Sequence, residues 1–305
     1  MSRVLIPIPA YDFDPTEVAV SWMRLVDARH EVIFATPDGT AAQGDPLMLT
    51  GEGLDLWGRV PGLRRAKVLG LFLRANSQAR KAYAALRGSP EFLAPRNYAE
   101  LEVGAYDALL LPGGHRAHGM RPYLEDVTLR SFVADFVDAE KPFAAICHGA
   151  VLAARSVSKK TGRSILYGRK TTGLTWSLER SAWNLMKHLG RVWDANYYRT
   201  YLESVEQAPG YCSVQAEVER ALRAPSDFLD VPAGSAHFFR KTSGLFRDSP
   251  GDSRAAFVVR DGDYVSARWP GDVNLFAKTF CEVLAERGRD PGAKGTLSAG
   301  SSAPA

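Results

Sequence analysis

The chain has 305 residues, of which 46% are hydrophobic and 24% are charged, and its formal net charge is +4. This is an ordinary globular composition with enough apolar residues for a sizeable core, and no run approaches the roughly 20 apolar residues that a membrane helix needs. Because 34 acidic residues offset 38 basic ones, the charge also argues against nucleic-acid binding. We expect neither a nucleic-acid nor a membrane partner.

The cysteines and the N-terminus indicate a cellular location. Cys147, Cys212 and Cys281 are far apart and form no C-x-x-C pair, so neither a disulfide framework nor a thiolate zinc site is expected. Residues 1–9 have one basic residue and two prolines in a short apolar run, without the longer apolar stretch and cleavage site of a secretory signal. A reducing, cytoplasmic environment fits these features.

The first 40 residues predict the opening of a parallel sheet. Residues 3–8 are typical of a short buried strand, and apolar residues recur at helical spacing from Pro15 to Ala28. A second strand with a turn follows at 30–39. This β-α-β order predicts an α/β fold with a doubly wound, mostly parallel sheet and flanking helices, as in flavodoxin-like proteins.

The middle of the chain alternates between sheet elements and longer segments. A basic helical segment is expected over 63–86, inside a loop-rich stretch. The sheet resumes with strands at 108–114 and 143–146, and a helix over 127–137 separates them. Residues 178–247 are expected to be largely helical.

The end of the chain predicts a hairpin, a helix and a tail. Two alternating runs flank Asp261-Gly262, which is a strong hairpin signal, and a helix is expected over 272–287. The tail 288–305, rich in Gly, Ser, Ala and Pro, is expected to be disordered. We therefore expect one α/β domain over 1–287, with inserted segments at about 56–104 and 180–250.

The sequence A-A-I-C-H-G at 144–149 matches a nucleophile elbow, a sharp turn between a strand and a helix that exposes one side chain. Ala145 and Gly149 are small enough for the strand and the helix to pass closely. The positive end of the helix would favour the Cys147 thiolate. Free cysteines are more often buried small hydrophobes, but the elbow pattern favours a functional Cys147.

The strand at 109–111 ends in P-G-G-H, a tight turn that can bring backbone N–H groups to an adjacent site. The N–H groups of Gly114 and His148 are candidates for an oxyanion hole beside the sulfur, and Gly113 and His115 are candidates for contact with the substrate. Gly-Gly alone is weak evidence, because any tight turn uses it.

The pair L-L-L-P-G-G-H and A-A-I-C-H-G, about 30 residues apart, resembles the ThiJ/PfpI superfamily. The resemblance implies the class I glutamine amidotransferase-like fold. It covers roughly 1–55, 105–180 and 253–285, including the closing D-G-D-Y-V-S-A-R-W-P-G-D. In motif, the chain is most similar to the glyoxalase III-like branch.

The resemblance implies two acidic partners for the Cys-His pair. Glu17 matches the acid that the family places against the cysteine, although D-P-T-E at 14–17 is also a good capping box with Asp14 as the N-cap. A protonated Glu17 would donate a hydrogen bond to the thiolate or shuttle a proton. Glu179 matches the acid that orients His148 in the glyoxalase III-like branch; the alternative is a solvated glutamate at a helix start.

The expected function is that of a cysteine-dependent enzyme acting on a small carbonyl compound, with methylglyoxal converted to lactate without glutathione. The alternatives are an amide or peptide hydrolase that forms an acyl-cysteine, and a redox sensor or chaperone with an oxidisable Cys147. True glutaminases of this fold use a late H-x-E segment, which this chain lacks.

No cofactor is expected, because the chain has neither a G-x-G-x-x-G segment nor a P-loop. The spacing of His115 and His118 suggests a metal, but no third ligand is evident, so no metal is expected. A carbonyl substrate is the expected partner, and a homodimer is left open.

Overall fold

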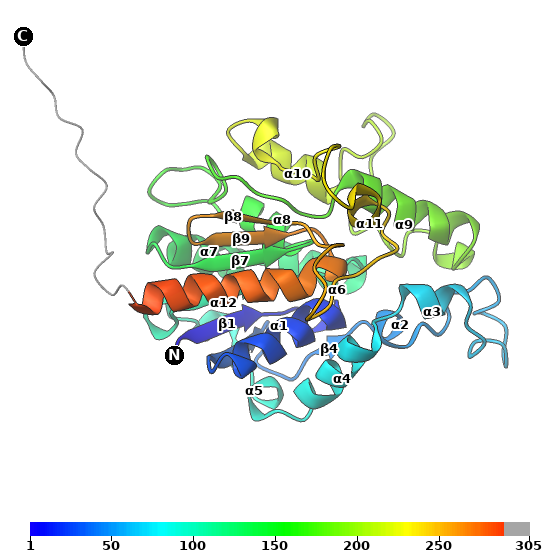
Figure 1. Cartoon of the computed structure of the whole chain (residues 1–305), viewed down its shortest axis with the longest axis horizontal. Coiled ribbons are helices and arrows are strands. Elements are labelled where there is room, and N and C mark those ends of the chain that lie inside the picture. The colour runs from blue at the N-terminus through cyan, green and yellow to red at the C-terminus, as the bar shows by residue number, and fades with distance from the viewer. Residues whose placement is uncertain (290–305) are drawn as a thin grey trace, which may run out of the picture.

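A seven-stranded sheet organises the computed structural model, which describes residues 1–289 (Figure 1). The strand order is β5-β3-β1-β6-β7-β9-β8, and all neighbours are parallel except the β8–β9 hairpin. Its strands are β1 (Arg3–Pro7), β3 (Glu31–Thr36), β5 (Arg96–Asn97), β6 (Ala108–Leu111), β7 (Phe143–Ile146), β8 (Val258–Asp261) and β9 (Tyr264–Ala267). The expected mostly parallel α/β fold is confirmed.

A smaller parallel pair of strands lies outside this sheet and consists of β2 (Tyr11–Phe13) and β4 (Gln43–Gly44). The α-helices of the described residues are α1 (Pro15–Asp27), α2 (Pro46–Thr50), α3 (Leu69–Leu73), α4 (Ser77–Leu86), α5 (Pro90–Leu93), α6 (Ala117–Glu125), α7 (Val127–Asp138), α8 (Gly149–Arg155), α9 (Trp176–His188), α10 (Val214–Ala221), α11 (Phe238–Thr242) and α12 (Val273–Arg289).

Short 3-10 helices complete the elements: η1 (Tyr98–Glu100), η2 (Val103–Ala105), η3 (Val192–Asp194), η4 (Pro225–Asp227) and η5 (Pro270–Asp272). Among residues 1–289, none of these helices is both long enough and apolar enough to span a bilayer.

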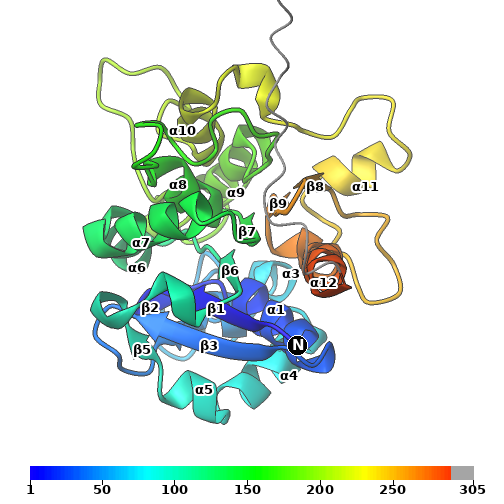
Figure 2. The ribbon, with the colours of Figure 1, turned by 90° about the vertical axis from the view of Figure 1, so that its left-hand side faces the viewer.

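Both faces of the sheet are buried, because successive side chains along each strand point to opposite faces. In β1, Val4 and Ile6 pack with α1, α4 and α12, whereas Leu5 packs with α6, α7 and α8 on the other side. Figure 2 shows the sheet between these two groups of helices. This explains why the strand sequences are continuous apolar runs rather than alternating ones.

The two longer segments contain less helix than expected. The helix predicted over 63–86 is interrupted, because Asn76 caps a new helix, α4, by accepting a hydrogen bond from the Ala79 N–H (2.8 Å). Residues 178–247 are mostly connections between α9, α10 and α11, since prolines and glycines such as Pro209-Gly210 interrupt helices. The prediction of a largely helical segment is wrong.

The hairpin and the last helix predicted near the C-terminus are both present. The hairpin across Asp261-Gly262 is confirmed, with Asp261 opposite Tyr264, and the last helix is confirmed as α12. That helix continues to Arg289, so residues 288–289 are helical rather than part of a tail. The remainder of the predicted tail, 290–305, lies outside the described residues.

Candidate functional site

Cys147 lies at the sharp turn between β7 and α8. Its φ of 56° is in the left-handed region, which a non-glycine residue adopts only where the surrounding structure holds it. The Cys147 N–H donates to the Ala267 carbonyl at 3.1 Å, so the turn is attached to the neighbouring strand β9. The geometry is that of the predicted elbow.

Gly149 allows α8 to begin directly above the sheet. A Cβ at this position would lie 2.0 Å from the Leu111 carbonyl oxygen, far closer than any real contact. A Cβ at Gly113 would similarly lie 2.6 Å from the His148 nitrogen. The two glycines therefore bring the P-G-G turn and the Cys-His turn into contact, as the sequence predicts.

Glu17 comes to the sulfur from the first turn of α1. Asp14 caps this helix by accepting hydrogen bonds from the backbone N–H groups of Thr16 (2.7 Å) and Glu17 (3.0 Å). The Glu17 side chain does not complete a capping box: its Oε2 accepts a hydrogen bond from the Gly113 N–H at 2.7 Å. The carboxyl group also interacts with the Cys147 side chain, as the resemblance implies.

Burial determines the protonation state of Glu17. The side chain is fully buried, and within the described residues its Oε1 has no hydrogen-bond partner. Burial, with the charge of Asp14 as a second cause, raises the pKa of the Glu17 carboxyl well above its usual value. The raised pKa favours the protonated, neutral form of Glu17, with Oε1 as the oxygen that can carry the proton.

The expected thiolate at Cys147 does not follow from this environment. Burial raises the pKa of the Cys147 thiol well above its usual value, and the hydrogen bond from the His148 backbone N–H opposes this only in part. Burial therefore favours the neutral thiol over the expected thiolate.

The His148 ring connects the sulfur to Thr200. Its Nδ1 lies 3.5 Å from Cys147 Sγ, and its Nε2 lies 2.9 Å from Thr200 Oγ1. Burial lowers the pKa of His148 to about 3, so the ring is neutral at pH 7 and carries one proton. The Thr200 hydroxyl donates its only hydrogen to the His115 carbonyl at 2.7 Å.

This arrangement determines the tautomer of His148. Since the Thr200 hydroxyl has no second hydrogen to give, it must accept one from Nε2. The lone pair of Nδ1 then faces the sulfur. A neutral thiol beside this lone pair can transfer its proton to the ring as the sulfur attacks a substrate.

The prediction that Glu179 orients His148 is wrong. Glu179 is buried, but its Oε1 pairs with Arg199 Nε at 3.0 Å and its Oε2 accepts a hydrogen bond from the Val214 N–H at 3.1 Å. A fully buried arginine needs such a partner, and Glu179 supplies it. The position beside His148 is taken by Thr200 instead.

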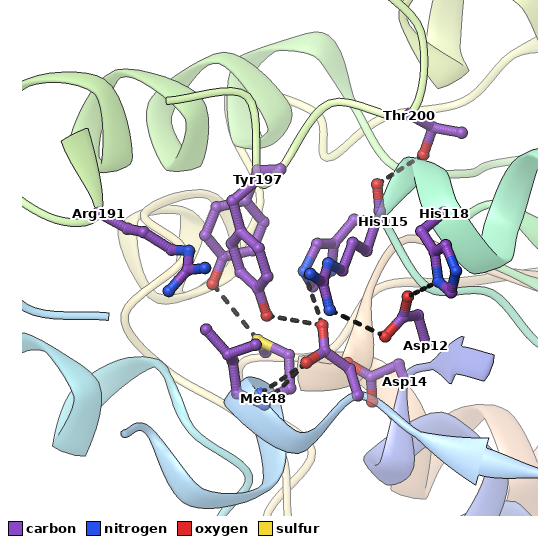
Figure 3. A network of polar contacts seen from close by, with 12 residues as sticks. Asp12, Asp14, Met48, His115, His118, Arg191, Tyr197 and Thr200 are labelled. Carbon is purple, nitrogen blue, oxygen red and sulfur yellow. Dashed lines mark hydrogen bonds and ion pairs between the residues drawn. The ribbon is translucent and has the colours of Figure 1, made fainter. Parts of the chain in front are cut away.

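His115 and His118 have different partners. His118 Nδ1 lies 2.9 Å from an Asp12 carboxylate oxygen, while the buried His115 ring packs on Tyr197 and lies 3.7 Å from Asp45 (Figure 3). Among the described residues, no group of three His, Cys, Asp or Glu side chains lies close enough to hold a metal ion. His115 is instead part of the pocket wall beside the sulfur.

A cavity of about 300 Å³ lies above Cys147. Besides Cys147, its polar lining includes Asp14, Glu17, His115 and Glu179. The wall is otherwise mostly apolar and comes from both inserted segments, through α3, α9 and the loop at 243–247. Figure 1 shows α3, α9 and α11 near the carboxyl ends of the strands, where ligands bind in open α/β sheets. Gly114 also lines the cavity, and its role in an oxyanion hole stays a prediction.

Three residues of the site were not predicted from the sequence. Thr200 and Arg247 belong to the second inserted segment, and Trp269 follows the last strand; the latter two line the cavity. No local motif surrounds Thr200 or Arg247. The W-P-G-D sequence at 269–272, directly after a strand that neighbours Cys147, is the one signal that could have indicated Trp269.

Comparison with known proteins gives a family match and two curated relatives. The model of a family described as ThiJ/PfpI family-like matches residues 8–211. The chain is 34% identical to Protein/nucleic acid deglycase 2 of Escherichia coli over 99 residues. This matched stretch covers 32% of this chain and 52% of the relative. The chain is also 26% identical to an uncharacterized protein of Schizosaccharomyces pombe over 137 residues. That stretch covers 44% of this chain and 45% of the relative.

The chain spans about half the length of these curated relatives. Among solved structures, glyoxalase III of Candida albicans superposes with a TM-score of 0.51 at 17% identity, covering 92% of this chain and 96% of that chain. At 17% identity, this structural similarity establishes the fold alone.

Proposed function

Because this chain belongs to the ThiJ/PfpI-like family, we propose that it is a cysteine-dependent enzyme that acts on small reactive carbonyl compounds. The specific reaction that we propose is the conversion of methylglyoxal to lactate without glutathione. The observation that carries this proposal is Cys147 at a strained elbow, between the carboxyl of Glu17 and the ring of His148, in a buried cavity.

In the first step, the Cys147 sulfur adds to the aldehyde carbon. The thiol proton passes to Nδ1 of His148, which lies 3.5 Å from the sulfur. The aldehyde oxygen becomes an alkoxide, which the N–H groups of Gly114 and His148 stabilise and which Glu17 protonates from Oε1. The product of this step is a hemithioacetal on Cys147.

In the second step, a proton moves between the two former carbonyl carbons. Glu17, now ionised, removes the hydrogen from the carbon bonded to sulfur, and the neighbouring carbon receives a proton through an enediol. This leaves a lactoyl thioester. Water then attacks the thioester, releases lactate and restores the thiol, so methylglyoxal plus water gives lactate with no oxidant or reductant.

The E. coli relative named as a deglycase supports the proposal, since it is 34% identical over the part that matches. A redox sensor with an oxidisable Cys147 is a second candidate. A hydrolase that forms an acyl-cysteine would use the same residues. A cytoplasmic location and a homodimer remain predictions.

The test is to incubate the purified protein with methylglyoxal, in the absence of glutathione, and to measure D- and L-lactate. Cys147→Ala should abolish turnover, and Cys212→Ala, at a partly exposed cysteine outside the cavity, should leave it unchanged. Turnover that persists in Cys147→Ala would sink the proposal. An inactive wild type that forms a sulfinate at Cys147 in mild peroxide would favour the sensor, and release of ammonia from amides would favour the hydrolase.

A further inference from the structure

The cavity is larger than methylglyoxal requires. Its volume of about 300 Å³ equals the share of roughly ten water molecules in the liquid, at about 30 Å³ each. Methylglyoxal has five non-hydrogen atoms and would leave about half of this space unfilled. A substrate with about ten non-hydrogen atoms would fill it.

The unfilled part of the cavity has an apolar wall. Aliphatic and aromatic side chains from separate parts of the chain line it: Phe72 and Leu73 from α3, Leu178 and Leu185 from α9, Leu245 from the loop after α11 and Trp269 after β9. Apolar walls with a few polar groups at the reacting end are typical of sites that hold an apolar ligand. The polar residues of the lining are Asp14, Glu17, His115, Glu179, Ser181, Tyr198, Ser243 and Arg247.

The rim of the cavity is also apolar. Phe72 and Leu245 line the cavity although 79% and 74% of their surfaces are exposed. Single exposed apolar residues are ordinary, but two that border one cavity above a nucleophile provide an apolar entrance. A substrate that passes or rests there would bury them.

The charges around the cavity do not favour an anionic tail. Among the described residues that line the cavity, Arg247 is the one cationic side chain, because the buried His115 ring is neutral. The Arg247 guanidinium lowers the pKa of the Asp14 carboxyl, although burial, the larger effect, raises it. The guanidinium also donates to the Leu73 carbonyl at 3.0 Å. Its Nη1 has no hydrogen-bond partner among the described residues, but the acids Asp14, Glu17 and Glu179 line the same cavity, so the lining as a whole does not favour an anionic tail.

We propose that the substrate is a 2-oxoaldehyde or similar reactive carbonyl compound with an uncharged apolar tail of about six carbon atoms. The carbonyl unit lies at Cys147, and the tail lies between α3, α9 and Trp269. This inference rests on the proposed function for the carbonyl unit, but the preference for an apolar tail is a property of the cavity alone.

The first part of the test measures kcat/KM for methylglyoxal, 2-oxobutanal, 2-oxohexanal and 2-oxooctanal, which share one electrophile and differ in alkyl length. Each buried methylene should raise kcat/KM about fourfold, up to 2-oxooctanal, which has ten non-hydrogen atoms. Values that stay flat or fall with chain length would overturn the inference.

The second part needs no turnover. The rates at which iodoacetamide and its N-butyl and N-hexyl derivatives alkylate Cys147 are measured by mass spectrometry, with Cys212 in the same molecule as the reference. The ratio of the Cys147 rate to the Cys212 rate should rise with chain length. A rising ratio without carbonyl turnover would uphold the apolar site and refute the proposed reaction; methylglyoxal turnover with no length dependence in either part would do the reverse.

Variants at the rim complete the test. Phe72→Ser and Leu245→Ser replace exposed side chains and should leave folding intact, while reducing the advantage of 2-oxooctanal over methylglyoxal by about fourfold or more. The matched control is Leu189→Ser, at a leucine that is 69% exposed and lies outside the cavity lining. If all three variants behave alike, the tail does not bind at this rim.

Discussion

Thr200 determines which nitrogen of His148 faces the reactive sulfur. Its hydroxyl donates to the His115 carbonyl at 2.7 Å and lies 2.9 Å from His148 Nε2, so the neutral ring must carry its proton on Nε2. The Nδ1 lone pair, 3.5 Å from the Cys147 sulfur, is thereby available as a base. A neutral hydroxyl performs the orienting role that an acid performs in a Cys-His-acid triad.

Thr200→Val should therefore slow the reaction of the thiol. The isosteric valine leaves the Nε2–H without an acceptor, which costs about 1–3 kcal/mol and should lower kcat/KM by at least about fivefold. Thr200→Ser, which keeps the hydroxyl, should restore most of the rate. Nitrogen NMR of His148 gives an independent measurement, because the wild type should show the Nε2–H tautomer. Equal activity of the valine and serine variants would contradict this positioning role.

Glu17→Gln should separate the acid function from the structural one. Glutamine can still accept the hydrogen bond from the Gly113 N–H, but it cannot donate and recover a proton, so activity should fall by about 100-fold or more.

Because burial raises the pKa of Glu17, the unfolded chain releases this proton above about pH 4.5 while the folded protein keeps it. The wild type should therefore lose stability relative to Glu17→Gln as the pH rises above that value. Urea unfolding at several pH values measures the difference, and parallel pH curves would argue for an ionised Glu17.

The parts of the site that could be predicted are those that local sequence controls. The Cys147 elbow and the Gly113 turn follow buried strands of one parallel sheet, and such turns meet at the same edge of the sheet. Glu17 lies at the start of a helix whose position that sheet also determines. Thr200 could not be predicted in the same way, because its connection lacks regular structure and its contact with His148 spans 52 residues.

The error at Glu179 has a physical cause. The residue was expected beside His148 because it matches the orienting acid of the glyoxalase III-like branch, and the structure does bury it. Sequence patterns do not show that Arg199 and His148 compete for the Glu179 carboxylate. Arg199 is also fully buried, and a buried guanidinium attracts the nearest carboxylate more strongly than a neutral imidazole does. The helical prediction for 178–247 failed for a local reason, since prolines and glycines such as Pro209-Gly210 interrupt helices.

Glu179 is consequently expected to contribute to stability. Glu179→Gln leaves the buried Arg199 with Glu203 as its remaining partner, at 2.7 Å, and should destabilise the fold by about 3 kcal/mol. Glu203→Gln, which removes the more exposed partner, should cost less, about 1 kcal/mol. Urea unfolding at pH 8 gives both values. If Glu179→Gln instead abolished activity at unchanged stability, the acid would act on His148 after all.

Gly149→Ala tests the close approach of α8 to the sheet. The added Cβ would lie 2.0 Å from the Leu111 carbonyl, so the helix start must shift, at a cost of about 3 kcal/mol. The control is Gly234→Ala, where a Cβ meets nothing within 4 Å and the change should be within about 0.5 kcal/mol. Thermal and urea unfolding provide the comparison. Equal stability of the two variants would mean that α8 does not approach the strand this closely.

His148 should make the fold sensitive to mild acid. Its pKa is lowered to about 3 by burial, whereas in the unfolded chain a histidine has a pKa near 6.5. Below pH 6.5 the unfolded state binds a proton on this histidine that the folded state does not bind, so the free energy of unfolding falls as the pH falls. At pH 5 the loss from this one residue is about 2 kcal/mol, from 1.36 kcal/mol for each pH unit.

His148→Gln does not titrate and can still donate a hydrogen bond to Thr200. The difference in unfolding free energy between wild type and this variant should therefore change by about 2 kcal/mol between pH 7 and pH 5, with the wild type losing more. Urea unfolding at the two pH values measures it, and subtraction of the two proteins removes the contributions of His115 and Asp45, which also titrate in this network. A constant difference across the range would show that His148 takes up its proton in the folded state, and the neutral base proposed for the thiol would then be wrong.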